Sequence, residues 1–179
     1  LTAIYTPAPA DAGTTVVLRL TANGNAPCAS ASDNMNLQVA AAPTVNAGPD
    51  GSTCVNAAYT ISGASAANYS SLLWTIVSGA GTLTNATTLT ATYTPAPADA
   101  GTTVVLRLTA NGNAPCASVS DDRNLQVVAA PTVNAGADAS TCVNIAYTIS
   151  GASATNYSSL LWTIVSGSGT LTNAPTLTA

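Results

Sequence analysis

The sequence of 179 residues contains no lysine, glutamate, histidine or phenylalanine, and charged residues make up only 6% of it. An ordinary soluble domain has about 25% charged residues. Without histidine there is no imidazole to act as a base, to bind a metal ion or to complete a Ser-His-Asp triad. With a net charge of -4 and no basic cluster, the chain also lacks the electrostatic character of a nucleic-acid-binding protein. We therefore expect neither an enzyme nor a nucleic-acid-binding protein, and no cofactor.

The sequence also lacks a long hydrophobic run. The longest apolar stretch, residues 72–77, is interrupted by Thr75, and a membrane-spanning helix needs about 18 such residues. Hydrophobic residues nevertheless make up 47% of the chain, which is too much for a disordered linker. The polar residues are mainly threonine, serine and asparagine, which are common in strands and turns. This composition predicts an all-β protein with a neutral surface and no membrane insertion.

One segment of the sequence occurs twice. TPAPADAGTTVVLRLTANGNAPCAS begins at Thr6 and again at Thr94, an offset of 88 residues. The same offset relates Cys28 to Cys116, Cys54 to Cys142, Tyr69 to Tyr157 and Trp74 to Trp162. A period of this length is longer than the repeats of solenoids and propellers, which have about 20–50 residues, and it suits one β-sandwich domain of roughly 100 residues. The sequence therefore predicts tandem β-sandwich repeats, each with its own core.

The repeat boundaries are predicted at two similar stretches, VAAAPTVNAG (39–48) and VVAAPTVNAG (127–136). Each joins the end of an apolar strand to small residues and a proline that favours extended structure before it. Residues 1–41 are then the C-terminal half of one repeat, 42–130 a complete repeat, and 131–179 the N-terminal half of the next. The linkers are short and contain no glycine, so we expect a restricted angle between repeats. Because the chain starts at Leu1 without a signal-like stretch, we expect it to be a segment of a longer protein.

Within the complete repeat, short apolar runs between turn residues predict strands, and no stretch has helical periodicity. Asn111 and Gly112 predict a hairpin turn. Alternation places Val104, Leu106 and Leu108 on one face of their strand. The expected strands are residues 44–47 and 52–55 (a split first strand), 58–62, 72–77, 82–83, 89–94, 102–110 and 123–128.

Several side chains admit two interpretations. Trp74 and Trp162 could stack on carbohydrate, but a tryptophan on the third strand of a sandwich more commonly anchors the core. Arg107 could pair with Asp121 or Asp122, or remain solvated.

The aspartates raise the question of calcium, which needs six to eight oxygen ligands. Asp50, Asp99 and the Asp121-Asp122 pair lie beside turns and strand ends, without the spacing of a calcium loop. We interpret them as turn-forming residues and leave weak calcium binding open.

The four cysteines, Cys28, Cys54, Cys116 and Cys142, do not have the C-x-x-C spacing of a zinc or redox site. They are candidates for disulfides, which would imply an extracellular setting. Within the complete repeat the available pair is Cys54 and Cys116. An immunoglobulin-like topology would instead put these two cysteines at opposite ends of the domain, separated by more than the roughly 7 Å that a disulfide spans. That topology favours a bond between neighbouring repeats, and both connectivities stay open.

The sequence resembles the PKD-like, immunoglobulin-like repeats of giant secreted surface proteins of Bacteroidetes-type bacteria. The matching stretches are PTVNAGPD (43–50), YTISGASA (59–66), SLLWTIVSGAGTL (71–83), TYTPAPADAG (92–101) and VVLRLTANGNAPCASVSD (104–121). The resemblance implies an extracellular β-sandwich spacer in adhesins, gliding-related proteins or surface filaments. The W-D-F-G-D-G motif of better-known PKD domains is replaced here by LWTIVS (73–78), so no role of its carboxylates is transferred.

Together these features predict a structural repeat segment of a long cell-surface protein that forms a stiff stalk or filament. Its expected partners are the neighbouring repeats and, in a fibre, copies of itself. The alternative is a carbohydrate-binding or adhesive accessory module of a secreted protein, which would require exposed aromatic rings.

Overall fold

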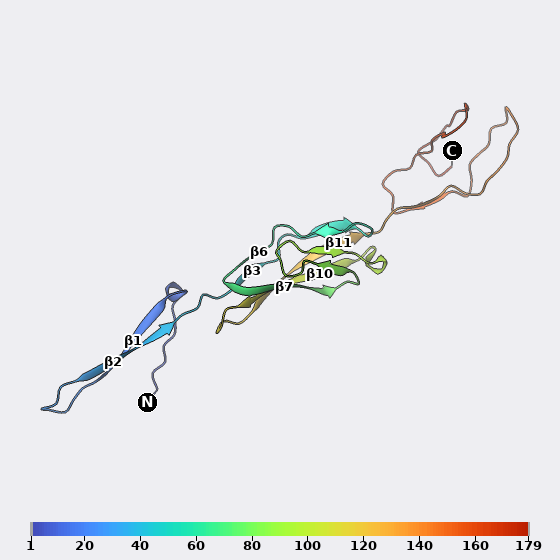
Figure 1. Ribbon diagram of the computed structural model, residues 1–179. Coiled ribbons are helices and arrows are strands. Elements are labelled where there is room, and N and C mark those ends of the chain that lie inside the picture. The colour runs from blue at the N-terminus through green and yellow to red at the C-terminus, as the bar shows by residue number, and fades with distance from the viewer. Residues whose placement is uncertain (1, 179) are drawn as a thin grey trace.

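The structure is a computed structural model that describes residues 2–178, and it consists of strands, turns and two short 3-10 helices (Figure 1). Three parts follow one another along the molecule. We call them the N-terminal segment (residues 2–41), the central unit (42–130) and the C-terminal segment (131–178). The two ends of the chain lie at opposite ends of the molecule (Figure 1). None of the described residues belongs to a helix long and apolar enough to cross a membrane.

The central unit contains several sheets in the arrangement of a β-sandwich. Its largest sheet has four strands in the order β4-β11-β10-β7, a second has the order β5-β9-β8, and β3 pairs with β6. All of these pairs are antiparallel except β4 with β11. The bounds are β3 Thr44–Asn46, β4 Gly51–Cys54, β5 Tyr59–Thr60, β6 Ser65–Ala67, β7 Tyr69–Ser78, β8 Thr82–Thr84, β9 Thr92–Thr94, the 3-10 helix η2 Pro97–Asp99, β10 Thr103–Gly112 and β11 Val119–Val128.

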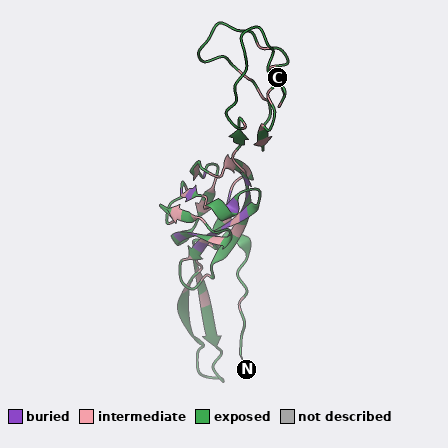
Figure 2. Ribbon diagram, turned by 90° about the vertical axis from the view of Figure 1, so that its right-hand side faces the viewer, coloured by how far each residue is buried: buried purple, intermediate pink, exposed green. Residues whose placement is uncertain are grey.

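The core of the molecule lies inside the central unit (Figure 2). Strand β10 contributes alternate residues to it, because successive side chains of a strand point to opposite faces of the sheet. The predicted face of Val104, Leu106 and Leu108 is fully buried. Trp74 from β7 and Tyr93 from β9 pack into the same core, together with Ala47, Ile61, Leu72, Ala91, Ala110, Leu125 and Val127.

The two outer segments repeat the local structure of the central unit without its core. In the N-terminal segment, η1 (Pro9–Asp11), β1 (Thr15–Ala22) and β2 (Ala31–Gln38) correspond to η2, β10 and β11 at the 88-residue offset. In the C-terminal segment, β12 (Thr132–Asn134) and β13 (Ser153–Thr155) correspond to β3 and β6. Their apolar side chains are largely exposed: Leu20, the counterpart of the buried Leu108, is 78% exposed.

Three details of the central unit differ from the sequence-based expectations. The strand before the last hairpin continues through Asn111 and Gly112, and the turn lies further on, where the Cys116 N–H donates to the Asn113 carbonyl oxygen at 2.8 Å. The halves of the split first strand join different sheets, since β3 pairs with β6 whereas β4 pairs with β11. The short strand β6 was not expected, because its three small residues carry no hydrophobic alternation.

Leucine truncation in the central unit and in the N-terminal segment should have unequal effects. Leu108→Ala removes a fully buried side chain and should lower the free energy of unfolding by about 2–5 kcal/mol. Leu20→Ala, at the equivalent but exposed position, should change it by less than about 0.5 kcal/mol. Urea unfolding of both variants, at dilution, measures the difference. Equal effects would contradict a core confined to the central unit.

Candidate functional site

The junction between the N-terminal segment and the central unit is held by contacts on both sides. Val39 still belongs to the N-terminal segment, because its N–H donates to the Thr14 carbonyl oxygen at 2.9 Å. From the central unit, the Cys116 Sγ lies 3.7 Å from the Ala40 carbonyl oxygen and 3.6 Å from that of Ala41. The side-chain amide of Asn68 donates to the Ala42 carbonyl oxygen at 3.1 Å. The polar backbone of the linker is therefore bound by the unit that follows it.

The junction after the central unit has the same pattern. The Val127 N–H donates to the Thr102 carbonyl oxygen at 2.9 Å, and the Val55 N–H donates to that of Val128 at 2.9 Å. From the C-terminal segment, the Asn156 side-chain amide donates to the Ala130 carbonyl oxygen at 3.2 Å. Asn156 is the counterpart of Asn68 at the 88-residue offset, so both junctions use the same side chain in the same way.

All four cysteines, at positions 28, 54, 116 and 142, carry free thiols in the structure. Cys54 and Cys116 lie at opposite ends of the central unit. Cys54 is in register with Val128, at the junction that follows, whereas Cys116 contacts the preceding junction at Ala40 and Ala41. A direct bond between these two cysteines would therefore require rearrangement of the unit.

Trp74 is confirmed as a core residue. It is 2% exposed, and its indole N–H donates to the Thr88 carbonyl oxygen at 3.0 Å. Trp162, its counterpart in the C-terminal segment, makes the same hydrogen bond to the Thr176 carbonyl oxygen at 3.0 Å, but it is only half-buried. A tryptophan with its N–H satisfied and its ring enclosed packs the core, so Trp74 is not available to stack on a ligand.

A buried tyrosine–aspartate pair closes one end of the sandwich. The Tyr93 hydroxyl donates to Asp99 Oδ2 at 2.7 Å, and the backbone N–H groups of Ala80 and Ala96 donate to the same carboxylate at 2.7 and 2.8 Å. Burial and the Asp99 hydrogen bond raise the pKa of Tyr93 to about 12. Burial alone would raise the pKa of Asp99, but the hydrogen bonds from Ala80, Tyr93 and their neighbours together lower it. The pair ties β9 to the turns around it.

A second buried polar group, Arg123, was not predicted from the sequence. Its guanidinium group donates to the carbonyl oxygens of Ala47 at 3.3 Å and Ser62 at 3.2 Å, and to the Tyr59 hydroxyl at 2.8 Å. It also lies over the Tyr59 ring, 5.4 Å from its centre. The Arg123 Nε makes no hydrogen bond to any described residue. Arg123 is 1% exposed, and its contacts with Ala47, Tyr59 and Ser62 hold β11 against the other half of the unit.

Two positions that differ between repeats lie close to this arginine. Gly51 leaves room for the Tyr59 hydroxyl, because a Cβ at position 51 would overlap it. At the 88-residue offset the glycine is replaced by Ala139 and Arg123 is replaced by Met35. A methionine needs no hydroxyl partner, so the tyrosine is free to move away from the added methyl group. Ala139 and Met35 lie in different outer segments of the chain, so Gly51 and Arg123 are the two residues of this exchange that meet in one core.

The predicted ion pair of Arg107 is confirmed, with Asp122 as its partner. The Arg107 Nε and Nη2 each donate to a different carboxylate oxygen of Asp122 at 2.7 Å. Both side chains are about 40% exposed, so the pair contributes little to stability. Asp121, the other candidate, instead accepts a hydrogen bond from the Ala47 N–H at 2.8 Å.

Asp50, the remaining aspartate considered as a calcium ligand, is hydrogen-bonded within the protein. Asp50 accepts hydrogen bonds from the backbone N–H of Asn124 at 2.8 Å and from its side-chain amide at 3.1 Å. These bonds lower the pKa of Asp50. Within residues 2–178 no three aspartate or cysteine side chains converge on one point.

No known protein family, curated protein or solved structure matches this chain.

The raised pKa of Tyr93 predicts a loss of stability in alkali. The folded protein keeps this tyrosine neutral up to about pH 12, whereas the unfolded chain ionises it near pH 10. Below pH 10 the group adds its full stability, and between pH 10 and 12 the free energy of unfolding should fall by about 1 kcal/mol per pH unit. Urea unfolding at pH 9, 10 and 11 measures this slope. Tyr93→Phe should remove it, and Tyr69→Phe, at an exposed position, should leave it unchanged; equal slopes in both variants would refute the assignment.

The exchange at positions 51 and 123 predicts energetic coupling. Gly51→Ala should lower the free energy of unfolding by about 1–3 kcal/mol, because its methyl group overlaps the hydroxyl held by Arg123. In the Arg123→Met background Tyr59 is released, and the same substitution should cost less. Urea unfolding of the four proteins gives the coupling energy, which we expect to exceed about 0.5 kcal/mol. Additive effects would contradict the pairing.

Proposed function

We propose that the chain is a structural repeat segment of a long extracellular surface protein and forms part of a stiff stalk or filament. Its repeats are immunoglobulin-like, PKD-like β-sandwiches of 88 residues, with residues 42–130 as a complete repeat. Residues 1–41 are the C-terminal half of one neighbour and residues 131–179 the N-terminal half of the other.

The observation that carries this proposal is the double attachment of each linker. Residues up to Val39 are hydrogen-bonded into the preceding unit, and β3 begins at Thr44 in the next. The carbonyl oxygens of Ala40 and Ala41 contact Cys116 of the following unit. Within that unit Asn68 binds the Ala42 carbonyl oxygen, and Pro43 is buried. A linker with so few free residues and no glycine cannot act as a flexible joint. Consecutive units are thus fixed in relative orientation, as a spacer requires.

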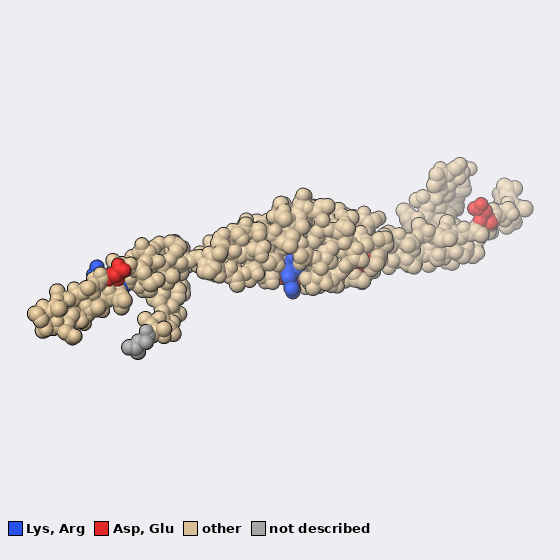
Figure 3. Space-filling model, turned by 60° about the horizontal axis from the view of Figure 1, so that its bottom comes forward, with Lys and Arg blue, Asp and Glu red and all other residues tan. Residues whose placement is uncertain are grey.

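The surface of the molecule supports the same role. Figure 3 shows one face with few charged side chains among neutral ones. The aspartates of the central unit bind backbone N–H groups, Arg107 or Tyr93 and do not form a cluster. A surface without a charged patch or a convergent polar cleft suits a passive element whose copies pack closely. The neutral exterior also means that little charge is desolvated when copies pack side by side.

The alternative function, a carbohydrate-binding or adhesive accessory module, needs exposed aromatic rings in one plane. Burial of Trp74 removes the main candidate for that platform. Tyr69 is the exposed ring of the complete repeat, and one ring does not make a stacking surface. Tyr147 and Tyr157 are exposed in the C-terminal segment, where the apolar side chains are largely exposed. No observation favours this function over the spacer.

Small-angle X-ray scattering of the chain tests the fixed orientation. At dilution, where the scattering mass equals one chain of 17.5 kDa, we expect the profile of a straight rod. Inserting Gly-Ser-Gly-Ser between Ala41 and Ala42 should shorten the mean end-to-end distance and broaden its distribution, because both attachments of the linker are broken. The same insertion after Ser168, in an exposed turn of the C-terminal segment, is the control. A flexible wild-type chain would refute the stiff spacer.

The cellular location has a separate test. An antibody raised against the 179-residue polypeptide should label intact cells of the source organism along extended surface structures in electron micrographs. Labelling that appears only after the cells are made permeable would contradict a surface location.

A further inference from the structure

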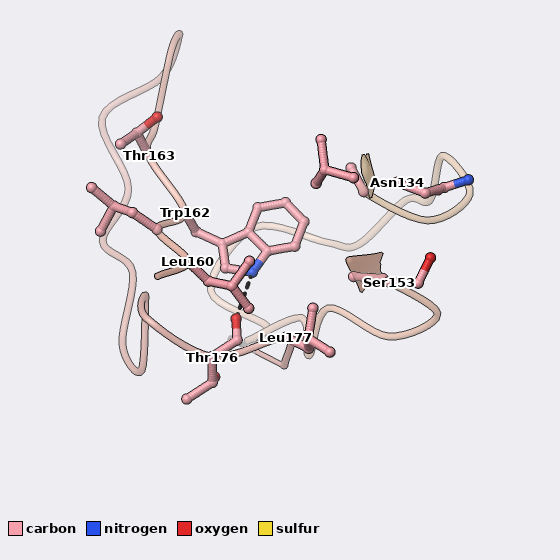
Figure 4. A pocket seen from close by; sticks show the side chains of 11 residues that line it. Asn134, Ser153, Leu160, Trp162, Thr163, Thr176 and Leu177 are labelled. Carbon is pink, nitrogen blue, oxygen red and sulfur yellow. Dashed lines mark hydrogen bonds between the residues drawn. The ribbon is translucent and has the colours of Figure 1, made fainter. Parts of the chain in front are cut away.

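The C-terminal segment carries an open apolar pocket of about 220 Å³ (Figure 4). Its lining includes Val133, Ala135, Leu160, Trp162 and Leu177. At the 88-residue offset these residues correspond to Val45, Ala47, Leu72, Trp74 and Leu89, all of which belong to the core of the central unit or pack against it. The pocket is therefore one half of a sandwich core that the C-terminal segment cannot close by itself.

The N-terminal segment also carries an open pocket, of about 710 Å³. Tyr5, Leu18, Leu20 and Leu37 line it together with Met35. The counterparts of the first four are Tyr93, Leu106, Leu108 and Leu125, which are fully buried in the central unit. The residues of this pocket thus correspond to the second half of a sandwich core. They provide the apolar side chains that would cover the pocket of the C-terminal segment.

The central unit shows how two such halves fit together. Residues 43–90 correspond to residues 131–178, and residues 92–129 correspond to residues 4–41, at the 88-residue offset. In the central unit β10 from the second half lies between β7 of the first half and β11. In addition, β9 pairs with β5 and β8, and β11 pairs with β4. The four-stranded and three-stranded sheets therefore each combine strands from residues 43–90 with strands from residues 92–129.

We propose that, in the 179-residue polypeptide, residues 4–41 of one copy bind residues 131–178 of a second copy and complete a β-sandwich between the two chains. The hairpin of β1 and β2 would occupy the places of β10 and β11. Within one chain the two segments lie at opposite ends of the molecule (Figure 1), with the central unit between them. The complex therefore grows head to tail. This proposal rests on the repeat architecture proposed above, and not on a stiff linker or a surface location.

Charge and side-chain size in the two segments match each other. Met35 in the N-terminal segment replaces the buried cation of Arg123, and Ala139 in the C-terminal segment replaces Gly51. Combining Ala139 with an arginine would crowd the hydroxyl group that the arginine requires. Met35 avoids that conflict, so the C-terminal segment suits the N-terminal segment better than it suits the second half of the central unit.

The same arrangement brings cysteines of two copies together. In the central unit Cys116 contacts the carbonyl oxygens of Ala40 and Ala41 in the preceding linker. By the 88-residue offset, Cys28 of the second copy would contact Val128 and Ala129 of the first. Cys54 of the first copy is in register with Val128, so Cys54 and Cys28 of the second copy flank the same residue.

The far end of the composite sandwich repeats this juxtaposition. There Cys142 of the first copy would be in register with Ala40 of the second copy, whose own Cys116 already contacts that residue. Each contact between copies thus brings two cysteine pairs together.

With glutathione disulfide as the oxidant, each pair can form a disulfide by two thiol–disulfide exchanges. The two protein sulfurs lose two electrons, the glutathione S–S bond is cleaved, and two molecules of reduced glutathione carry away the two thiol protons. The two copies bind noncovalently first, and the disulfides then link copies that are already bound.

The binding test uses light scattering on the reduced polypeptide over a range of concentrations. We expect the mass to rise in multiples of 17.5 kDa and to fall to one chain on dilution. Leu20→Asp, which spoils the hairpin, and Leu160→Asp, which spoils the pocket, should each give a monomer under conditions where the wild type associates. Mixing these two variants should give a dimer that does not grow, because each retains one intact half. Val165→Asp, at a position 96% exposed whose counterpart Val77 is also exposed, should associate like the wild type.

The outcomes separate the proposals. A wild-type monomer at all concentrations, or no dimer in the mixture, overturns the complementation of halves. Association of either variant alone indicates lateral packing and also overturns it. Urea unfolding of the central unit, unchanged in both variants, shows that a loss of association is not a loss of folding. A rod-like monomer that does not associate would leave the proposed function standing, and a flexible chain that does associate would leave this proposal standing.

The cysteine pairs are tested on the same mixed dimer, in which the Leu20→Asp copy supplies the pocket. In a buffer of oxidised and reduced glutathione, a non-reducing gel should show a covalent dimer that dithiothreitol dissociates. Cys54→Ser with Cys142→Ser in the Leu20→Asp copy should abolish the covalent dimer. Cys28→Ser with Cys116→Ser in that copy is the control and should leave it intact. A covalent dimer lost only in the control overturns the assigned pairs.

Discussion

The central unit depends on one strand, β10, whose two edges and one face must all be covered. Its edges are hydrogen-bonded to β7 and β11, and its inner face buries Val104, Leu106 and Leu108. Because β7 precedes it in sequence by more than twenty residues and β11 follows it, the sheet forms only when both halves of a repeat are present. The outer segments show the result when one half is missing: the local turns and hairpins persist, but the apolar faces stay open.

Much of this architecture could be predicted from the sequence, because the strands that dominate the core have strong alternation. The faces of β7 and β10 follow from residues such as Trp74 and Leu106, whose burial is confirmed. The Asn-Gly pair led to a wrong position for the last turn, since the pairing of β10 with β7 extends to Gly112 and Tyr69 and carries the strand past the expected turn. Local propensity gave way there to the register of the sheet.

The polar contacts were harder to predict, because they depend on which residues the fold brings together. Arg123 alternates with apolar residues on β11, and nothing in its sequence neighbourhood indicates that a half-buried tyrosine and two carbonyl oxygens bind it. Asn68 likewise lies in a polar stretch, and its partner Ala42 is 26 residues away in the sequence. The partners of the Asp99 carboxylate, Ala80, Tyr93 and Ala96, are likewise spread along the chain before it. A comparison of the two repeats does single out positions 35 and 123, as a place where an apolar and a charged side chain exchange.

The parallel pairing of β4 with β11 has a mechanical consequence. Four residue pairs, from Leu125 with Gly51 to Val128 with Cys54, join the strand near the beginning of the unit to the strand at its end. Tension along the chain pulls these two strands past each other, so the hydrogen bonds between them are loaded together and must break nearly at once. An antiparallel pair pulled from one end would instead open one bond at a time. The order of strands in the sheet thus gives the unit resistance to extension along the direction in which the units follow one another.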